Sequence, residues 1–187
     1  MPDLLAGAPE RPTPALSDSQ GLLRPLQPSD VEGLMAVQAA CYGADYLESA
    51  ELYAQRLACA HQASLGIECP HTRRLKAYAA AYWSNPDKLT PLRGAFAAPA
   101  QGEQVLYLHD MAVAPAWAGR GAARRLLDSL LRRARAQGVR RAALVSVQGS
   151  QAYWSRQGFV PRELPPGEQR GHLLSYGEDA VYMVAPL

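Results

Sequence analysis

The chain has 187 residues, of which 48% are hydrophobic, and its formal net charge at pH 7 is only +2. This length and composition predict one globular domain with a core large enough to fold without disulfides, and so small a charge excludes a general polyanion partner. No stretch reaches the roughly 20 apolar residues of a membrane span, and the amino terminus lacks the runs of a signal peptide, so we expect a cytoplasmic protein.

The three cysteines indicate neither a disulfide framework nor a metal site. Cys41, Cys59 and Cys69 form no CxxC pair and have no ligand spacing with His61 or His71. We therefore expect a reduced setting and no bound metal.

The first third of the chain predicts a tail followed by a strand and two helices. Residues 1–20 carry four prolines among small and polar residues and are expected to be a flexible tail, so the domain itself would cover 21–187. A short strand is expected at 22–26 and a helix at 28–42. Ser29 and Ser49 are candidate N-caps, and Ser49 would open a second helix that runs to about residue 60.

A hairpin and a long loop are expected next. Residues 63–69 and 75–83 are predicted strands joined by a turn at 70–74. The stretch 85–104 is rich in Pro, Gly and Ala and is predicted to be a loop.

The segment 106–133 is the most informative part of the sequence. A strand at 107–113 is followed by Pro115, which ends it, and by Gly119 and Gly121, which permit a tight turn into an amphipathic helix. The first N–H groups of that helix have no partner within it, and the helix dipole adds positive charge there, so the turn favours a bound anion. A plain strand, turn and helix is the alternative.

Arginines are unusually dense after this turn. The stretch 120–141 contains a single acidic residue, Asp128, and eight arginines, namely Arg120, Arg124, Arg125, Arg132, Arg133, Arg135, Arg140 and Arg141. They indicate either a solvated helix face or a field that attracts phosphate.

The remaining elements complete an alternating pattern. After the stop signal at Gly138 we expect a strand at 142–147, a helix at 150–157 ending at Gly158, a strand region from Phe159 and a closing strand at 181–184.

The central turn resembles the signature of the GNAT superfamily of acyl-CoA-dependent N-acyltransferases, (Q/R)xxGx(G/A) after a strand ending like LxVxPxxRG. Here Met111-Ala112-Val113-Ala114-Pro115 precedes Ala118-Gly119-Arg120-Gly121-Ala122-Ala123. The resemblance covers about 22–187. It implies an α/β (α+β) fold with a mixed central sheet of six to seven strands, splayed between the fourth and fifth, and about four flanking helices.

The resemblance also implies acetyl-CoA as the acyl donor. The donor would bind at two places in the sequence, and the residues there are Met111, Ala112, Val113, Ala118, Gly119, Arg120, Gly121, Ala122, Ala123, Arg124, Ser150 and Trp154. Met111 and Val113 would hold the pantetheine arm and polarise the thioester carbonyl. Ala118 departs from the usual Gln or Arg, so backbone amides and nearby arginines would have to bind the pyrophosphate.

A second family pattern, NxxAxxxYxxxGF, is only partly kept. Gly158 and Phe159 match, and Ser150 stands at the small position, but Val147 replaces Asn and Trp154 replaces the tyrosine that often protonates the thiolate. An indole N–H is not an acid at ordinary pH. Protonation by Tyr153 or by solvent is left as the alternative, although Tyr153 should point about 100° away from Trp154.

Two titratable residues near the strand end are candidates for the base. His109 has an ordinary pKa near 6.5, which suits a base at neutral pH, and Asp110 would need burial or a water relay. Neighbours on a strand face opposite sides, so only one should face the cleft unless a bulge intervenes. His109 would then share a face with Met111 and Val113. Both residues could instead be structural.

The family resemblance places the acceptor between the first two helices, a loop and the carboxyl-terminal strands. The aromatic and acidic residues there are Tyr42, Asp45, Tyr46, Glu48 and Tyr176, with Glu178, Asp179 and Tyr182 as further candidates. They would suit an amine with an apolar body, or they fill space under a loop.

We therefore expect an N-acetyltransferase that transfers acetyl from acetyl-CoA to a primary amine by direct attack in a ternary complex. A small-molecule amine is favoured over a peptide or protein amine, a homodimer is possible, and no membrane or nucleic-acid partner is expected. The alternative is a non-catalytic acyl-CoA sensor.

Overall fold

The computed structural model describes residues 21–187, and the tail expected at 1–20 lies outside the described part. Its centre is a seven-stranded sheet in the order β1-β2-β3-β4-β5-β7-β6. The strands are β1 (Leu22–Pro25), β2 (Leu65–Glu68), β3 (Leu75–Ser84), β4 (Val105–Val113), β5 (Arg141–Ser146), β6 (Val160–Pro161) and β7 (Val181–Pro186). All neighbouring pairs are antiparallel except β4 and β5, which are parallel. The expected mixed sheet is confirmed.

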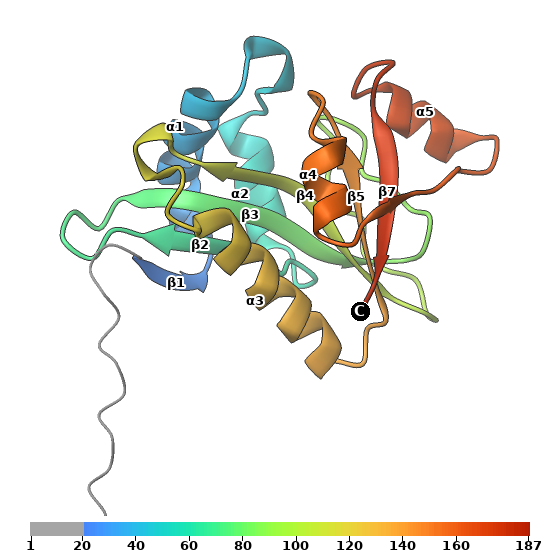
Figure 1. The fold of residues 1–187 in the computed structure, drawn as a ribbon, viewed down its shortest axis with the longest axis horizontal. Helices are drawn as coiled ribbons and strands as arrows, with labels where there is room; N and C mark the ends of the chain where they lie inside the picture. The colour runs from blue at the N-terminus through green and yellow to red at the C-terminus, as the bar shows by residue number, and fades with distance from the viewer. Residues whose placement is uncertain (1–20) are drawn as a thin grey trace, which may run out of the picture.

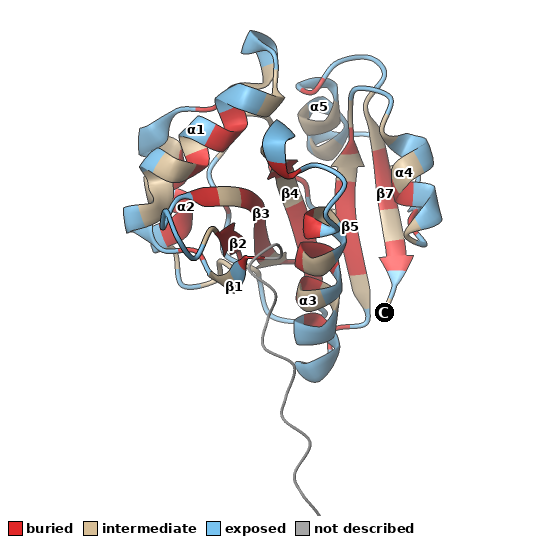
Figure 2. Ribbon diagram, turned by 60° about the vertical axis from the view of Figure 1, so that its left-hand side comes forward, coloured by how far each residue is buried: buried red, intermediate tan, exposed pale blue. Residues whose placement is uncertain are grey.

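Helices cover both faces of this sheet (Figure 1). They are α1 (Val31–Cys41), α2 (Ala50–Ala58), α3 (Ala122–Ala136), α4 (Gln151–Arg156) and α5 (Glu168–Leu174). Buried side chains of α1 and α2 pack in one core cluster, and those of α3 and α4 pack in another on the opposite face. In Figure 2 the strands are mostly buried and α3 turns its buried side toward them. None of the helices in the described part is long and apolar enough to cross a bilayer.

The sequence predicted every strand and every α-helix of the described part except α5. That helix has seven residues, includes Gly171 and has no buried residue, so it carries none of the apolar periodicity by which a helix is recognised. Ser49 is the N-cap of α2, as expected, and its side chain accepts a hydrogen bond from the N–H of Leu52. Ser29 is not an N-cap, because it lies inside the short 3-10 helix Pro28–Asp30 and Asp30 precedes α1.

The sheet opens between β4 and β5. The two strands pair only from Leu106 to Leu108 on β4, opposite Ala142 to Leu144 on β5. The rest of β4 runs on to Val113 without a partner in β5, and a strand edge of this kind exposes main-chain groups to a ligand. The splay implied by the family resemblance is present.

A β-bulge in β4 changes the predicted orientation of His109. Ala80 pairs with Asp110 while Ala81 pairs with Leu108, so His109 is the extra residue. A bulge places two successive side chains toward one face. His109 and Asp110 therefore both face the α1 and α2 side, and the expectation that His109 shares a face with Met111 and Val113 is wrong.

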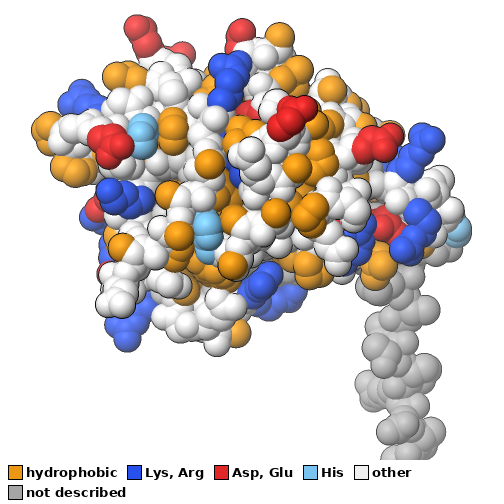
Figure 3. Space-filling model, turned by 180° about the vertical axis from the view of Figure 1, so that it is seen from behind, with side chains coloured by type: hydrophobic (Ala, Val, Ile, Leu, Met, Phe, Trp, Pro, Cys, Tyr) orange, Lys and Arg blue, Asp and Glu red, His pale blue; other side chains and the backbone are white. Residues whose placement is uncertain are grey.

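The face seen from behind carries α1 and α2 (Figure 3). Basic and acidic side chains are scattered over it among apolar ones, with no single-sign stripe.

Candidate active site

A pocket of about 320 Å³ lies where β4 and β5 separate. β4 contributes Leu108 to Met111 and β5 contributes Leu144 and Val145. The other lining residues come from the segment between α1 and α2, the loop after β3, α4 with the turn before it, and the segment after α5, namely Tyr42, Tyr46, Glu48, Leu92, Val147, Gln148, Ser150, Tyr153, Trp154 and Tyr176. The pocket is thus bounded by the open strand edge on one side and aromatic side chains on the other.

The exposed edge of β4 offers two main-chain N–H groups to this opening. The N–H of Ala114 donates to the carbonyl of Lys76 at 2.8 Å, so alternate residues of β4 turn their main chain toward β3. Met111 and Val113 therefore turn theirs the other way. Their carbonyls accept from the Tyr42 hydroxyl at 3.0 Å and the Cys41 thiol at 3.2 Å, while no described residue accepts from their N–H groups.

The turn after β4 is a second set of free amides, which we name the phosphate cradle (residues 118–124). Gly119 and Gly121 have φ of +74° and +75°, a region that favours glycine, and a Cβ at either would meet nothing within 4 Å. No described residue accepts a backbone hydrogen bond from the N–H groups of 119–124. Gly121 is the N-cap of the 15-residue helix α3, so the cradle combines open amides with a helix dipole and fits a pyrophosphate.

The side chains around the cradle contribute less than its main chain. Ala118 and Arg124 are exposed, and Arg124 lies 3.5 Å from Asp128 in an open ion pair. The Arg120 guanidinium lies over the Trp117 ring, 5.4 Å from its centroid. Ala122 is buried and Ala123 is half-buried against the sheet.

The α4 side of the pocket carries both aromatic residues of the second signature. Trp154 is nearly buried and contacts Phe159 edge to face, while Tyr153 is half-buried. Both border the pocket, although Tyr153 was expected to point elsewhere. Burial, then Asp128, raises the pKa of Tyr153, so its phenol keeps its proton. Ser150 donates to the Val147 carbonyl at 2.7 Å, which shapes the turn into α4.

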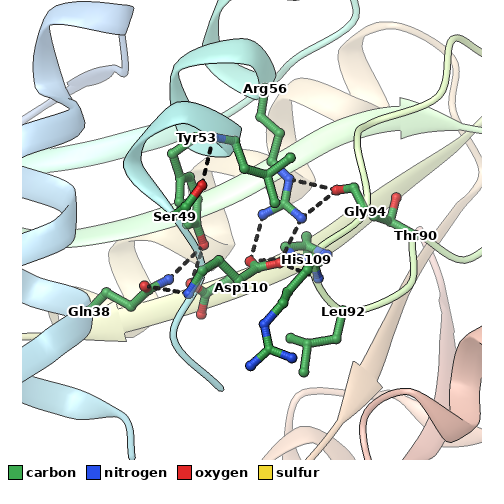
Figure 4. Close-up of polar contacts among 12 residues, drawn as sticks. Gln38, Ser49, Tyr53, Arg56, Thr90, Leu92, Gly94, His109 and Asp110 are labelled. Atoms are coloured by element: carbon green, nitrogen blue, oxygen red, sulfur yellow. Dashed lines mark hydrogen bonds and ion pairs between the residues drawn. The ribbon is translucent and has the colours of Figure 1, made fainter. Parts of the chain in front are cut away.

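The opposite side of the pocket rests on a buried ion pair. Glu48 and Arg56 have side chains 2% and 0% exposed, and Arg56 Nη1 and Nη2 lie 2.6 and 2.8 Å from the carboxylate (Figure 4). The N–H of Arg93 donates to the same carboxylate at 2.7 Å, and Arg56 also donates to the carbonyl of Gly94. Burial alone would raise the pKa of Glu48, but hydrogen bonds from His109 and Arg56 hold it well below its usual range.

His109 is bound to this pair through one ring nitrogen. Its Nε2 lies 3.0 Å from Glu48 Oε2 and its Nδ1 lies 3.2 Å from the hydroxyl oxygen of Tyr176. Burial and the charge of Arg56 lower the pKa of His109. The imidazole is therefore neutral at pH 7, with the N–H on Nε2 donating to Glu48 and a lone pair on Nδ1.

Asp110 is held by three tyrosines. The hydroxyls of Tyr42 and Tyr53 donate to its carboxylate at 2.6 and 2.7 Å, and Tyr78 donates to it as well. Burial, and then the Asp110 charge, raises the pKa of each of these phenols, so all three stay protonated. The Asp110 carboxylate thus accepts a hydrogen bond from each of three phenols.

The acceptor residues expected from sequence divide into two groups. Tyr42, Tyr46, Glu48 and Tyr176 border the pocket, and the Tyr46 hydroxyl donates to the Tyr176 carbonyl at 3.2 Å. The structure does not bring the others to it. The side chains of Asp45, Glu178 and Asp179 point into solvent, and Tyr182 is buried opposite Val145 in the sheet.

Arg56 is the functional residue that sequence reasoning missed. It follows Tyr53 by three positions and precedes Leu57, so it lies on the buried face of α2. The sequence did carry a signal for a buried charge here, because Arg56 falls on the apolar face of the predicted helix. Leu92 and Gln148 also border the pocket but carry no such signal.

Comparisons with known proteins agree with this geometry. The description "Acetyltransferase (GNAT) family" fits residues 32–159, more than half of the chain. No curated protein matches at a significant level.

Solved structures share the fold at low identity. The ribosomal-protein-S18-alanine N-acetyltransferase from Escherichia coli is 16% identical, with a TM-score of 0.63, over 88% of this chain and 92% of that one. The GphF GNAT-like decarboxylase in complex with isobutyryl-CoA is also 16% identical, with a TM-score of 0.68, over 88% and 98%. Arabidopsis thaliana NAA60 in complex with acetyl-CoA is 16% identical, with a TM-score of 0.66, over 89% and 98%.

Proposed function

The chain belongs to the GNAT family of acetyltransferases, and we propose that this enzyme transfers the acetyl group of acetyl-CoA to the primary amine of a small molecule. The observation that carries the proposal is the opening of β4 from β5 beside the phosphate cradle. A pocket bordered by both strands joins the free N–H groups of β4 to the aromatic acceptor side. Donor and acceptor would thus meet in one ternary complex.

The donor would be bound mainly by main-chain groups. The cradle amides and the first turn of α3 suit the pyrophosphate, and the N–H groups of Met111 and Val113 suit the pantetheine arm and the thioester oxygen. Acetyl-CoA supplies an acetyl group activated as a thioester. Ser150 and Trp154 would border the sulfur end of the arm.

Hydrogen bonds between distant segments close the acceptor end of the pocket, and this favours a small amine as the acceptor. The Tyr46 hydroxyl bonds the Tyr176 carbonyl, and the Arg93 guanidinium donates to the Asp45 carbonyl at 3.0 Å. These contacts join the segment between α1 and α2 to the segment after α5 and to the loop after β3. An extended peptide would have to break them, whereas an amine with an apolar body fits between the aromatic rings.

His109 is the better candidate for the base. An ammonium acceptor must lose a proton before its nitrogen can attack the thioester carbon. The Nδ1 lone pair of neutral His109 has one hydrogen-bond partner, the Tyr176 hydroxyl, whereas the Asp110 carboxylate accepts hydrogen bonds from three phenols. Tyr153 or solvent would protonate the leaving thiolate.

The test measures free thiol released from acetyl-CoA in the presence of a panel of primary amines and peptides. We expect release with small amines and little with peptides. CoA binding measured by calorimetry without thiol release for any acceptor would favour the acyl-CoA sensor, a reading to which the departures at Ala118, Val147 and Trp154 point.

His109→Gln and Asp110→Asn separate the two candidate bases. We expect His109→Gln to lower kcat by about 10²-fold and to abolish the acidic limb of the pH–rate profile. Asp110→Asn should keep that limb, since the residue only anchors the tyrosines. An unchanged pH–rate profile in His109→Gln would remove it as the base.

A further inference from the structure

Neither ring nitrogen of His109 is open to the pocket. Nε2 faces Glu48 and Nδ1 faces the Tyr176 hydroxyl, and the side chain is only 1% exposed. A proton from a bound amine can therefore reach the imidazole only through one of these two partners.

Glu48 is unsuited to carry that proton. Its carboxylate accepts from Arg56, from the N–H of Arg93 and from His109, and its side chain is 2% exposed. These donors hold its pKa well below its usual range against the effect of burial. Tyr176 is the remaining partner, and it borders the pocket.

The Tyr176 hydroxyl has one proton and two acceptors. Its oxygen lies 2.7 Å from the Thr90 carbonyl and 3.2 Å from His109 Nδ1. When His109 is neutral, the phenol donates to the Nδ1 lone pair. When Nδ1 carries a proton, it donates to the Tyr176 oxygen, and the phenol turns its own proton to Thr90. Nδ1 and the phenol oxygen are hydrogen-bonded to each other in both states, whereas the Thr90 carbonyl accepts the phenol proton only in the second, which favours movement of a proton to Nδ1.

We propose that Tyr176 is a catalytic residue that takes the proton of the acceptor ammonium while passing its own to His109 Nδ1. This inference rests on the proposed acetyl transfer. One N–H bond of the ammonium breaks and a bond forms to the Tyr176 oxygen, while the original phenolic O–H breaks and Nδ1–H forms. The neutral amine then forms the C–N bond to the thioester carbon and the C–S bond breaks. The second proton of the nitrogen neutralises the departing thiolate, directly or through Tyr153 or solvent, so the products are the amide and the CoA thiol. One proton moves from substrate to His109, and nothing is oxidised.

Glu48 and Arg56 are positioning residues in this relay. Glu48 holds the Nε2–H of His109, which leaves Nδ1 free to receive the proton. The groups facing the ring are Glu48, Arg56, Asp110, Tyr107 and Tyr176. Burial and Arg56 disfavour the imidazolium, whereas Glu48 and Asp110 favour it, so the ring is neutral before the reaction and can still accept a proton during it.

Tyr176→Phe removes the hydroxyl and keeps the ring. Two probe acceptors separate proton transfer from packing: phenethylamine is an ammonium at neutral pH, whereas aniline is already neutral. We expect kcat to fall by about 10²-fold with phenethylamine and much less with aniline, with an unchanged KM for acetyl-CoA. Equal losses with both probes would overturn the relay.

Tyr82→Phe is the matched control. The Tyr82 hydroxyl is buried and lies 2.5 Å from Thr90 Oγ1, so it touches the same residue as Tyr176, and its side chain lies outside the pocket. We expect turnover of both probes to stay near that of the parent. A loss like that of Tyr176→Phe would mean that disturbance of Thr90, and not loss of the relay, causes the effect.

Nitrogen NMR of His109 tests the relay without any acceptor. In the free protein we expect the Nε2–H tautomer, and we expect Tyr176→Phe, but not Tyr82→Phe, to shift the Nδ1 resonance. A proton resident on Nδ1 of the neutral ring would overturn the proposal. If neither probe amine reacts with the parent protein, the proposed acetyl transfer to small amines fails, while the NMR result still decides whether Tyr176 and His109 share a proton.

Discussion

The two ends of the pocket are built in opposite ways. The phosphate cradle is a run of consecutive residues with open main-chain amides, and most of its side chains are exposed. The acceptor end is a set of buried side chains from distant segments, which we name the acceptor-end network (Glu48, Arg56, His109, Asp110 and Tyr176). A pyrophosphate needs only N–H groups and a dipole, so a local turn suffices. Proton transfer needs fixed distances between side chains, and only packing supplies those.

The largest effect should follow from breaking the buried ion pair. Arg56→Ala leaves the Glu48 carboxylate buried beside an empty space, and we expect a loss of about 3–5 kcal/mol in the free energy of unfolding. Urea denaturation followed by circular dichroism measures it.

The exposed pair on α3 is the control for that loss. Arg124 and Asp128 have side chains 79% and 50% exposed, so Arg124→Ala should change the free energy of unfolding by less than about 0.5 kcal/mol. Similar losses in the two variants would mean that breaking the buried Glu48–Arg56 pair costs no more stability than breaking an exposed pair.

Acid should destabilise the acceptor end through two groups. The folded pKa values of His109 and Glu48 are both lowered, so the unfolded chain binds more protons and stability falls as the pH falls. Protonation of His109 in the unfolded chain lowers the free energy of unfolding below about pH 6.5, and protonation of Glu48 does so below about pH 4.3. Each group lowers this free energy by at most about 1.4 kcal/mol per pH unit. Denaturation midpoints measured from pH 8 to 4 should show this decline. In His109→Gln the decline between pH 6.5 and 5 should be shallower, and an unchanged slope would contradict the lowered pKa of His109.

A glycine substitution in the cradle should cost less stability than breaking the buried ion pair. Gly121→Ala and Gly138→Ala both place a Cβ at a φ near +75° with open space around it, so each should lose about 1 kcal/mol of stability. Gly138 lies beyond the far end of α3. Only Gly121→Ala should weaken CoA binding, by severalfold, in calorimetry. Equal CoA affinities in the two variants would place the pyrophosphate elsewhere.

Most of the fold could be predicted because its signals are local. Proline and glycine mark the ends of β4 and the start of α3, and the apolar pattern of α3 faces the sheet as expected. Helix α5 was missed because it buries nothing. His109 was placed on the wrong face because the bulge depends on how β4 pairs with β3. The register shifts between Ala80 and Ala81, and these two alanines give no sequence signal for a bulge.

The sequence by itself determined the phosphate cradle. A strand, a glycine turn and the start of a helix are consecutive there, and this order leaves main-chain N–H groups free to bind an anion. The tertiary structure alone decided the acceptor end. Glu48 and His109 are 61 residues apart in the chain and His109 and Tyr176 are 67 apart, so their contacts exist only after the sheet and helices have packed. The tertiary structure also decided that Asp110 accepts hydrogen bonds from three phenols and that Nδ1 of His109 faces the Tyr176 hydroxyl. Hydrogen-bond partners are set by distances in space and not by spacing in the sequence.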